Sequence, residues 1–253
     1  MKPFMRIILP EEFIWKRDTS LLSTLGIHEN TASIISVVGA GGKTSTIEHL
    51  AREYNVRNKQ VIVTTTTHML RPDISKWCRE ESLLLLDQYL EKQKEVWVGL
   101  PCGEDKMSSP SISFLEQLMK KKIPILIEAD GAKRLPFKIP GEQEPVLLKK
   151  STIVIGVLGL DALGLPLKEA CFRSELASKL LGKSEEDRIT IDDYVKVAGS
   201  SHGLKKEVSS DMKYVLILNK ADNEDRINQA IRIRSMLKEH TITDVIITSY
   251  DKR

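Results

Sequence analysis

A glycine-rich segment between an apolar run and a helical pattern carries the residue types needed to bind phosphate. It reads Val38-Gly39-Ala40-Gly41-Gly42-Lys43-Thr44-Ser45. Glycines let backbone N–H groups turn toward phosphate oxygens, and the N-terminus of a following helix adds partial positive charge. In such loops the lysine reaches the β- and γ-phosphates and the next hydroxyl binds Mg²⁺. The predicted nucleotide-contacting residues here are Gly39, Ala40, Gly41, Gly42, Lys43, Thr44 and Ser45.

The segment departs from the strict pattern G-x-x-x-x-G-K-[ST] at its first position. That pattern has a glycine where this chain has Val37. We therefore predict a variant phosphate-binding loop. The competing interpretation is a glycine-rich turn in which Lys43 and Thr44 occur by chance. The agreement of spacing, strand and helix favours phosphate binding.

Four threonines and a histidine, Thr64-Thr65-Thr66-Thr67-His68, follow the next apolar run. Hydroxyl groups at the carboxyl end of a strand can complete the ligand shell of Mg²⁺ or bind the γ-phosphate. We predict that role for Thr66 and Thr67. The β preference of threonine is enough to explain Thr64 and Thr65. His68 stays open between a structural hydrogen bond and a catalytic role.

Two acidic residues, Glu128 and Asp130, directly follow a third apolar run. A spacing of two places them on the same side of an extended strand. Two carboxylates that face one point are costly without a cation nearby, so we predict Mg²⁺ ligands that hold the metal or polarise an attacking water. Lys133 and Arg134 are the alternative source of positive charge. The proline-rich segment 135–145 is predicted to be an ordered substrate loop or lid near the site.

The segment Asn219-Lys220-Ala221-Asp222 follows an apolar strand and has the guanine-reading pattern of GTPases. There the Asp carboxylate accepts hydrogen bonds from the guanine N1–H and 2-amino group, the Asn supports the base and the Lys stem covers its face. GTPases place a second base-contacting turn where this chain has Thr248-Ser249. The alternative is that Asp222 is a helix N-cap. The predicted base-contacting residues are Asn219, Lys220 and Asp222, and the choice between ATP and GTP stays open.

Two further residues have open roles. Asp161 follows a strand and is either a metal or substrate ligand or part of an Asx turn. Arg173 is either a contact to a phosphate or anionic substrate or a member of a surface ion pair.

The elements that must position these residues are apolar strands that alternate with helical patterns. Most strands lack the two-residue alternation of a half-exposed strand and instead show the continuous Val/Ile/Leu composition of parallel strands covered on both faces. We predict an α/β fold with a doubly wound, mostly parallel sheet, similar to P-loop NTPases, with ligands at the carboxyl ends of the strands. Residues 1–30 are predicted to be an N-terminal covering segment. Residues 31–253 are predicted to be the α/β domain, and 170–212 a helical insertion without a strand.

Composition excludes several classes of protein. The chain has 253 residues, with 38 Lys plus Arg against 35 Asp plus Glu and a net charge of +3. This small excess argues against a protein that coats nucleic acid or a polybasic membrane protein. No apolar run reaches the ~18 residues of a membrane span, and the first twenty residues lack a signal-peptide cleavage site. Three widely separated cysteines favour neither disulfides nor zinc, so we predict a cytoplasmic protein.

The chain resembles the YqeC family of proposed accessory proteins for selenium-dependent molybdenum hydroxylases. The resemblance covers roughly residues 33–223, and the loop also looks like that of Mur ligases and folylpolyglutamate synthetases. It implies a role in the maturation or insertion of a selenium-containing molybdenum cofactor, with a hydroxylase or its cofactor as partner. The family pattern is expected to have His where this chain has Phe172. The motifs that carry the resemblance are 38–44, 63–68, 128–138, 159–161 and 219–222.

The sequence thus predicts a protein that binds Mg²⁺ with ATP or GTP and hydrolyses the nucleotide. The predicted catalytic residues are Lys43, Glu128 and Asp130. The predicted metal ligands are Thr44, Thr66, Thr67, Glu128 and Asp130. One alternative is a non-catalytic carrier for a nucleotide or a molybdopterin dinucleotide. A further alternative is a kinase for a small metabolite. A ligase is disfavoured because the large C-terminal domain of Mur ligases is missing from this sequence.

Overall fold

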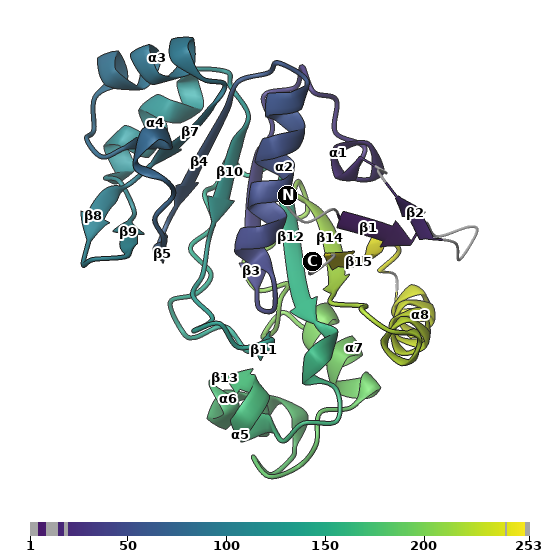
Figure 1. Cartoon of the computed structure of the whole chain (residues 1–253). Helices are drawn as coiled ribbons and strands as arrows, with labels where there is room; N and C mark the ends of the chain where they lie inside the picture. The colour runs from purple at the N-terminus through teal and green to yellow at the C-terminus, as the bar shows by residue number, and fades with distance from the viewer. Residues whose placement is uncertain (1–4, 9–14, 18–19, 241, 251–253) are drawn as a thin grey trace.

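A computed structural model describes residues 5–8, 15–17, 20–240 and 242–250 and contains a ten-stranded sheet (Figure 1). Eight neighbouring strands are parallel, and two antiparallel strands extend one edge. The sheet order is β2 (Trp15–Arg17), β1 (Met5–Ile8), β15 (Val245–Tyr250), β14 (Lys213–Asn219), β12 (Ile153–Gly159), β3 (Ile34–Gly39), β10 (Ile125–Glu128), β4 (Val61–Thr65), β7 (Glu95–Val98) and β6 (Trp77–Cys78).

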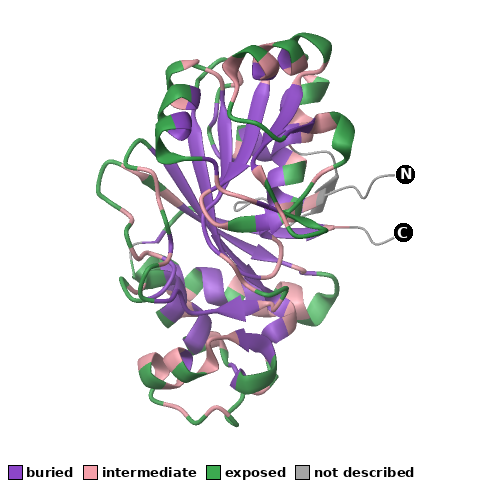
Figure 2. Ribbon diagram, turned by 90° about the vertical axis from the view of Figure 1, so that its left-hand side faces the viewer, coloured by how far each residue is buried: buried purple, intermediate pink, exposed green. Residues whose placement is uncertain are grey.

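Helices cover both faces of this sheet, which confirms the predicted doubly wound α/β architecture. On one face, α2 (Lys43–Val56) packs Ile47 against Ile35 in the same core cluster. On the other face, α3 (Leu83–Lys92) and α4 (Ile112–Lys120) pack on the cluster that contains Ile34. Successive side chains of β3 therefore enter opposite cores. Figure 2 shows the buried strands between helices whose outer sides are exposed.

The central strands of the sheet read as continuous apolar runs because both of their faces are buried. All residues of β3, β4, β10 and β12 are buried. Burial of one aliphatic side chain stabilises the fold by roughly 1.5–3 kcal/mol. Because helices cover both faces, apolar residues are favoured at successive positions and do not alternate with polar ones. A third core cluster lies under α7 (Ile191–Gly199) and α8 (Glu224–Glu239), with Leu216, Leu218 and Ile247 from β14 and β15.

A mainly helical segment connects β12 to β14 and lies at the lower end of the molecule in Figure 1. It contains η2 (Leu160–Ala162), α5 (Leu167–Ala170), α6 (Ser174–Leu181) and α7. It also contains β13 (Cys171–Phe172), which pairs with β11 (Phe137–Lys138). The expectation that residues 170–212 hold no strand is therefore wrong. A two-residue strand is too short to produce an apolar run.

The described part of the N-terminal segment joins the far edge of the sheet. β1 pairs antiparallel with β15, and α1 (Leu21–Thr24) buries Leu21 and Leu22 beside α2. Glu53 of α2 accepts hydrogen bonds from Ser20 Oγ at 2.5 Å and from the backbone N–H of Leu21 at 2.6 Å. Residues 1–4, 9–14 and 18–19, which fall within the predicted covering segment, lie outside the described residues.

A small antiparallel sheet lies beyond β4. It contains β5 (His68–Leu70), β9 (Lys106–Ser108) and β8 (Leu100–Cys102), and the short helix η1 (Ile74–Lys76) follows β5. None of the helices in the described ranges has the length and apolar composition to cross a bilayer.

Candidate functional site

The glycine-rich loop connects β3 to α2 and lies at the carboxyl edge of the sheet. Gly39, Gly41 and Gly42 have φ values of 96°, 76° and 141°, which other residues rarely adopt. A Cβ atom on Gly39 would lie 2.3 Å from the carbonyl oxygen of Val157, and one on Gly42 would lie 2.1 Å from Nδ2 of Asn219. Both the turn and the close approach of neighbouring strands therefore require glycine.

The loop amides fall into two groups. Those of Gly39, Ala40 and Gly41 donate to Asp130 Oδ2, Val157 O and Leu135 O, at 2.9, 2.8 and 3.2 Å. These residues shape the loop through internal hydrogen bonds. The backbone N–H groups of residues 42–45 have no acceptor within the described ranges. Free amides at a helix N-terminus can bind an anion, so the first turn of α2 is the part of the loop that could hold one.

Lys43 is buried, and its ammonium is held at the base of the loop. Its Nζ donates to Gly39 O at 2.7 Å and lies 3.1 Å from Asp130 Oδ1. Asp130 is 1% exposed and also lies 2.9 Å from Nζ of Lys138. The positive charge beside Asp130 thus comes from Lys43 and Lys138. The alternative that Lys133 and Arg134 supply the positive charge is therefore wrong for Asp130.

Glu128 ends β10 next to the start of α2, where its Oε2 accepts a hydrogen bond from Thr44 Oγ1 at 2.8 Å. The side chain is buried, and burial raises the pKa of Glu128 above its usual value. The Lys43 charge and the Thr44 hydrogen bond oppose that shift without cancelling it. A buried carboxylate with few donors is stabilised as the anion when a cation binds beside it.

The residues present fit Mg²⁺ held together with phosphate oxygens. Glu128 and Thr44 supply hard oxygen ligands next to the free amides of α2. Within the ranges that the structure describes, no group of three or more His, Cys, Asp or Glu side chains could hold a metal alone. Mg²⁺ commonly takes only one or two protein ligands and completes its shell with substrate phosphates and water.

The threonine run joins β4 to β10. Thr65 Oγ1 donates to Glu128 O at 2.8 Å, and the N–H of Thr66 donates to the same oxygen at 3.1 Å. The Thr66 hydroxyl donates to Val146 O at 2.8 Å, and the N–H of Thr67 donates to Thr65 Oγ1. The structure thus brings Thr66 and Thr67 close to Glu128, with the Thr66 hydroxyl engaged by the backbone.

Asn219 ties the end of β14 to the phosphate loop. Its Nδ2 donates to Gly41 O at 2.8 Å, and its Oδ1 accepts from Thr248 Oγ1 at 2.9 Å. Asp222 accepts a hydrogen bond from Ser249 Oγ at 2.6 Å. The two segments therefore lie together, but Thr248 and Ser249 belong to β15 itself, so the prediction that they form a turn after the last strand is wrong. The alternative that Asp222 caps α8 is wrong, because the N-cap is Asn223, which accepts from the N–H of Arg226.

Lys220 extends the site toward β12. Its Nζ lies 2.6 Å from Oδ2 of Asp161, so this ion pair is the observed role of Asp161. The Lys220 backbone is left-handed, with φ of 64°, a conformation that costs a non-glycine residue roughly 1–2 kcal/mol.

A chain of alternating charges connects the phosphate loop to α6. Arg173 and Lys138 both contact Glu144 Oε2, at 2.5 and 2.7 Å, and Lys138 continues the chain to Asp130. Burial opposes ionisation of Glu144, but hydrogen bonds from Arg173 and Lys138 lower its pKa to about 2. Lys138 is fully buried. Neither Lys138 nor Glu144 was among the predicted site residues, and the signal in the sequence was a lysine between apolar residues of a proline-rich loop.

The loop opens onto a cleft of about 870 Å³. Its lining includes residues 41–45, His68, Glu128, residues 131–135 and Lys220. A cavity of this size is typical of small-molecule sites. The structure thus brings Lys43, Thr44, Glu128 and Lys220 to one cavity, whereas Thr66, Thr67, Asp130, Asn219 and Asp222 are not among the residues that line it.

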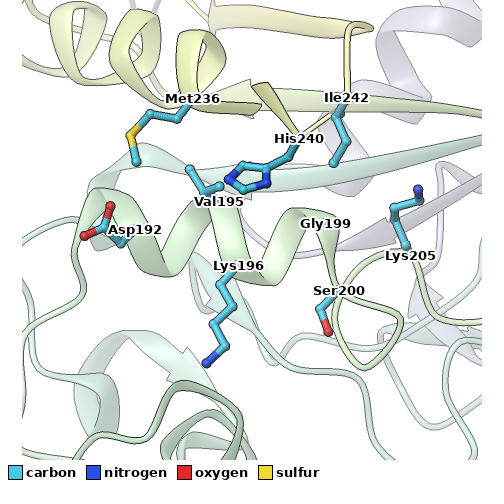
Figure 3. A pocket seen from close by; sticks show the side chains of 9 residues that line it. All are labelled: Asp192, Val195, Lys196, Gly199, Ser200, Lys205, Met236, His240 and Ile242. Carbon is cyan, nitrogen blue, oxygen red and sulfur yellow. The ribbon is translucent and has the colours of Figure 1, made fainter. Parts of the chain in front are cut away.

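A second cavity of about 520 Å³ lies between α7 and α8 (Figure 3). Val195, Met236 and Ile242 line it together with His240. Among the described residues that line it, none forms a carboxylate–hydroxyl pair like that of Thr44 and Glu128. The cleft at α2 is therefore the candidate functional site.

Two comparisons with known proteins bear on this site. The model of the family described as YqeC protein matches residues 35–175, which include the phosphate loop, the threonine run and the acidic strand end. Uncharacterized protein YqeC of Escherichia coli (strain K12) is 28% identical over 231 residues, which cover 88% of this chain and 90% of that protein.

Proposed function

This chain belongs to the YqeC family, and from that premise we propose that it binds a Mg²⁺–nucleoside triphosphate at the N-terminus of α2 and hydrolyses it. The observation that carries the proposal is the first turn of α2. There, four backbone amides without acceptors in the described chain lie beside the Thr44–Glu128 pair. An anion stabilises the amides, and a cation stabilises Glu128.

The residues divide the work of binding a triphosphate. The amides of residues 42–45 bind phosphate oxygens, while Thr44 and Glu128 hold the metal. Bound Mg²⁺ supplies positive charge that neutralises the oxygens of the transferred phosphoryl group. Lys43 adds charge from the base of the loop, and Glu128 is the carboxylate placed to orient an attacking water. Asp130 acts through Lys43, since its oxygens already contact Lys43, Lys138 and Gly39 N–H.

The base preference proposed here is guanine. In support, Asn219 donates a hydrogen bond to Gly41 O, so the proposed base-contacting segment is connected directly to the loop of the proposed phosphate site. Asp222 receives a hydrogen bond from Ser249 on one oxygen. It retains acceptor capacity for the two adjacent donors on the guanine edge. An adenine edge presents no such pair of donors to a carboxylate.

The binding test is calorimetry of Mg²⁺ with GTP, ATP and CTP on wild type and Thr44→Ala, with Ser113→Ala as an exposed hydroxyl control. The expected result is GTP affinity that is lost in Thr44→Ala and kept in the control. Equal affinity of wild type and Thr44→Ala would overturn the nucleotide site. Lys43→Ala is a poorer test because it removes one of two cations from buried Asp130, which is destabilising in its own right.

Turnover separates the enzyme from a carrier. The proposal expects Mg²⁺-dependent phosphate release that disappears in Thr44→Ala. Stoichiometric nucleotide binding without phosphate release would instead support the non-catalytic carrier. A rate that requires an added acceptor would support the kinase.

The cellular role proposed is maturation of selenium-dependent molybdenum hydroxylases, and its support is the sequence resemblance. Cells that lack this protein are expected to make hydroxylase with a reduced content of molybdenum or selenium. Elemental analysis of the purified hydroxylase measures this. Complementation by wild type but not by Thr44→Ala would connect the role to nucleotide binding, and unchanged metal content would contradict the role.

A further inference from the structure

The cleft extends past the phosphate loop on the side away from Lys220. Lys220 follows β14, which lies two strands from β3 on one side. His68 and Lys106 line the cleft from β5 and β9, beyond β4 on the other side. Neighbouring strands lie ~4.8 Å apart, so the distance from β14 to β4 is about 19 Å. A nucleotide with its triphosphate at β3 and its base toward β14 leaves the β4 side of the cleft open.

Two unpaired cations border the cleft. Lys133 and Arg134 belong to the loop that follows β10, and both are exposed. Among the described residues, neither side chain makes a hydrogen bond or an ion pair. Lys43 and Lys220 differ from them, because Lys43 contacts Asp130 and Lys220 contacts Asp161. The charges of Lys133 and Arg134 are therefore available to a ligand.

The backbone holds these two residues in a costly conformation. Lys133 and Arg134 are both left-handed, with φ of 46° and 64°. Consecutive conformations of this kind cost roughly 1–3 kcal/mol each and persist only where the surroundings fix them. Here Leu135 O accepts from Gly41 N–H at 3.2 Å, and buried Lys138 donates to Gly131 O at 2.6 Å. The loop is thus anchored on both sides of the two cations.

Phe172 holds the ammonium of Lys133 without neutralising it. The Lys133 Nζ lies 5.2 Å from the centroid of the Phe172 ring, which is within the range of a cation–π contact. Such a contact leaves the charge and the N–H donors of the ammonium free. Phe172 also lines the cleft. The departure at this position thus replaces the expected histidine with a ring that orients a cation.

We propose that the cleft binds a second, anionic small molecule, whose phosphate or carboxylate group is held by Lys133 and Arg134. This inference rests on the proposed function, because the nucleotide defines which part of the cleft is left. A guanidinium pairs with two oxygens of an oxyanion at once, and an ammonium adds a compact charge. Lys106, on the wall formed by β9, adds a third positive charge without a partner in the described ranges.

The test uses protein saturated with Mg²⁺ and the non-hydrolysable triphosphate analogue that wild type binds. Inorganic phosphate and succinate are the two probes, and they distinguish a phosphate group from a carboxylate group. Binding is followed by calorimetry in wild type and in Lys133→Ala/Arg134→Ala. The matched control is Lys149→Ala/Lys150→Ala, which removes two exposed positive charges that do not line this cleft.

The expected result is that at least one probe binds nucleotide-loaded wild type and binds the double variant at least tenfold more weakly. The control and the analogue affinity should stay within threefold of wild type. Absence of probe binding to wild type would overturn the proposal, as would an equal loss in the control. A parallel loss of analogue affinity would also overturn it, because the two cations would then hold the nucleotide itself.

The same titration on nucleotide-free Thr44→Ala protein separates this inference from the proposed function. If no triphosphate analogue binds wild type, the nucleotide proposal fails. A tenfold loss of probe binding on adding Lys133→Ala/Arg134→Ala to Thr44→Ala would still support the anion site. No loss would contradict it.

Discussion

Two carboxylates near opposite ends of α2 have pKa values shifted in opposite directions. Glu53, 11% exposed, lies near the C-terminal end of α2, and Glu128, 6% exposed, lies beside its N-terminus. Burial raises the pKa of Glu53, but hydrogen bonds from His49, Ser20 and the backbone outweigh it and lower the pKa to about 2. Burial raises the pKa of Glu128, which has Thr44 as its side-chain donor. A carboxylate whose oxygens accept hydrogen bonds from several donors stabilises the fold. A carboxylate with few donors is suited to binding a ligand.

The largest effect is expected from Glu128→Gln. The amide keeps the shape and the Thr44 contact but removes the charge that we propose holds Mg²⁺. We expect Mg²⁺-dependent nucleotide affinity to fall about 100-fold. The same change removes a buried charge, so the melting temperature without ligand should rise by ~2–4 °C, equivalent to about 1 kcal/mol. Calorimetry and a thermal scan measure both, with exposed Glu116→Gln as the control. If Glu128→Gln lowered stability and left nucleotide affinity intact, Glu128 would be a structural residue and the contrast with Glu53 would be wrong.

The second-largest effect is expected at Glu53, where stability should fall and nucleotide affinity should stay the same. Glu53→Gln removes an acceptor that holds the start of α1, and we expect unfolding to become easier by about 2 kcal/mol. Nucleotide affinity should not change. Denaturant titration and calorimetry on the same variant check this. A loss of affinity without loss of stability would show that Glu53 does not act as a structural anchor.

A third carboxylate, Asp222, extends the comparison. It is partly exposed, its Oδ1 accepts from Ser249 Oγ, and its Oδ2 lies 3.5 Å from Nη1 of Arg226, so it keeps acceptor capacity for a ligand. Asp222→Asn should shift preference from guanine to xanthine nucleotides by about tenfold, because the new amide donates where the carboxylate accepted. Competition between GTP and XTP measures the shift, and Asp225→Asn in the nearby first turn of α8 is the control. Equal binding of GTP and ATP by wild type would refute the guanine assignment.

The smallest effect is a difference in pH dependence. The folded-state pKa of Glu53 is lowered from 4.5 to about 2, so its contribution to stability is present above pH 4.5 and is lost as pH falls toward 2. The pKa of Glu128 is raised, so its carboxylate is protonated at a higher pH. Mg²⁺-dependent binding should therefore weaken at a pH where the Glu53 contribution is intact. Parallel decline of binding and stability would contradict this.

Part of this arrangement could be predicted from sequence because its signals are local. The continuous apolar strands and the glycine-rich loop follow from burial on both faces and from backbone conformations that exclude a Cβ. The source of charge for Asp130 could not be predicted. Lys133 and Arg134 have left-handed backbone conformations and line the cleft. The chain then returns in β11, which places Lys138 beside Asp130. That outcome depends on tertiary packing that no local pattern encodes.

The contact between Asn219 and Gly41 has a consequence for synthesis on the ribosome. The two residues are 178 positions apart, and β3 is flanked by β10 and β12, which are made long after it. The emerging chain therefore lacks the partners that shape the loop until most of its length has been translated. At ~5–20 residues per second, several seconds pass before these partners exist. The proposed nucleotide would thus stabilise the finished protein and would not guide the early steps by which it folds.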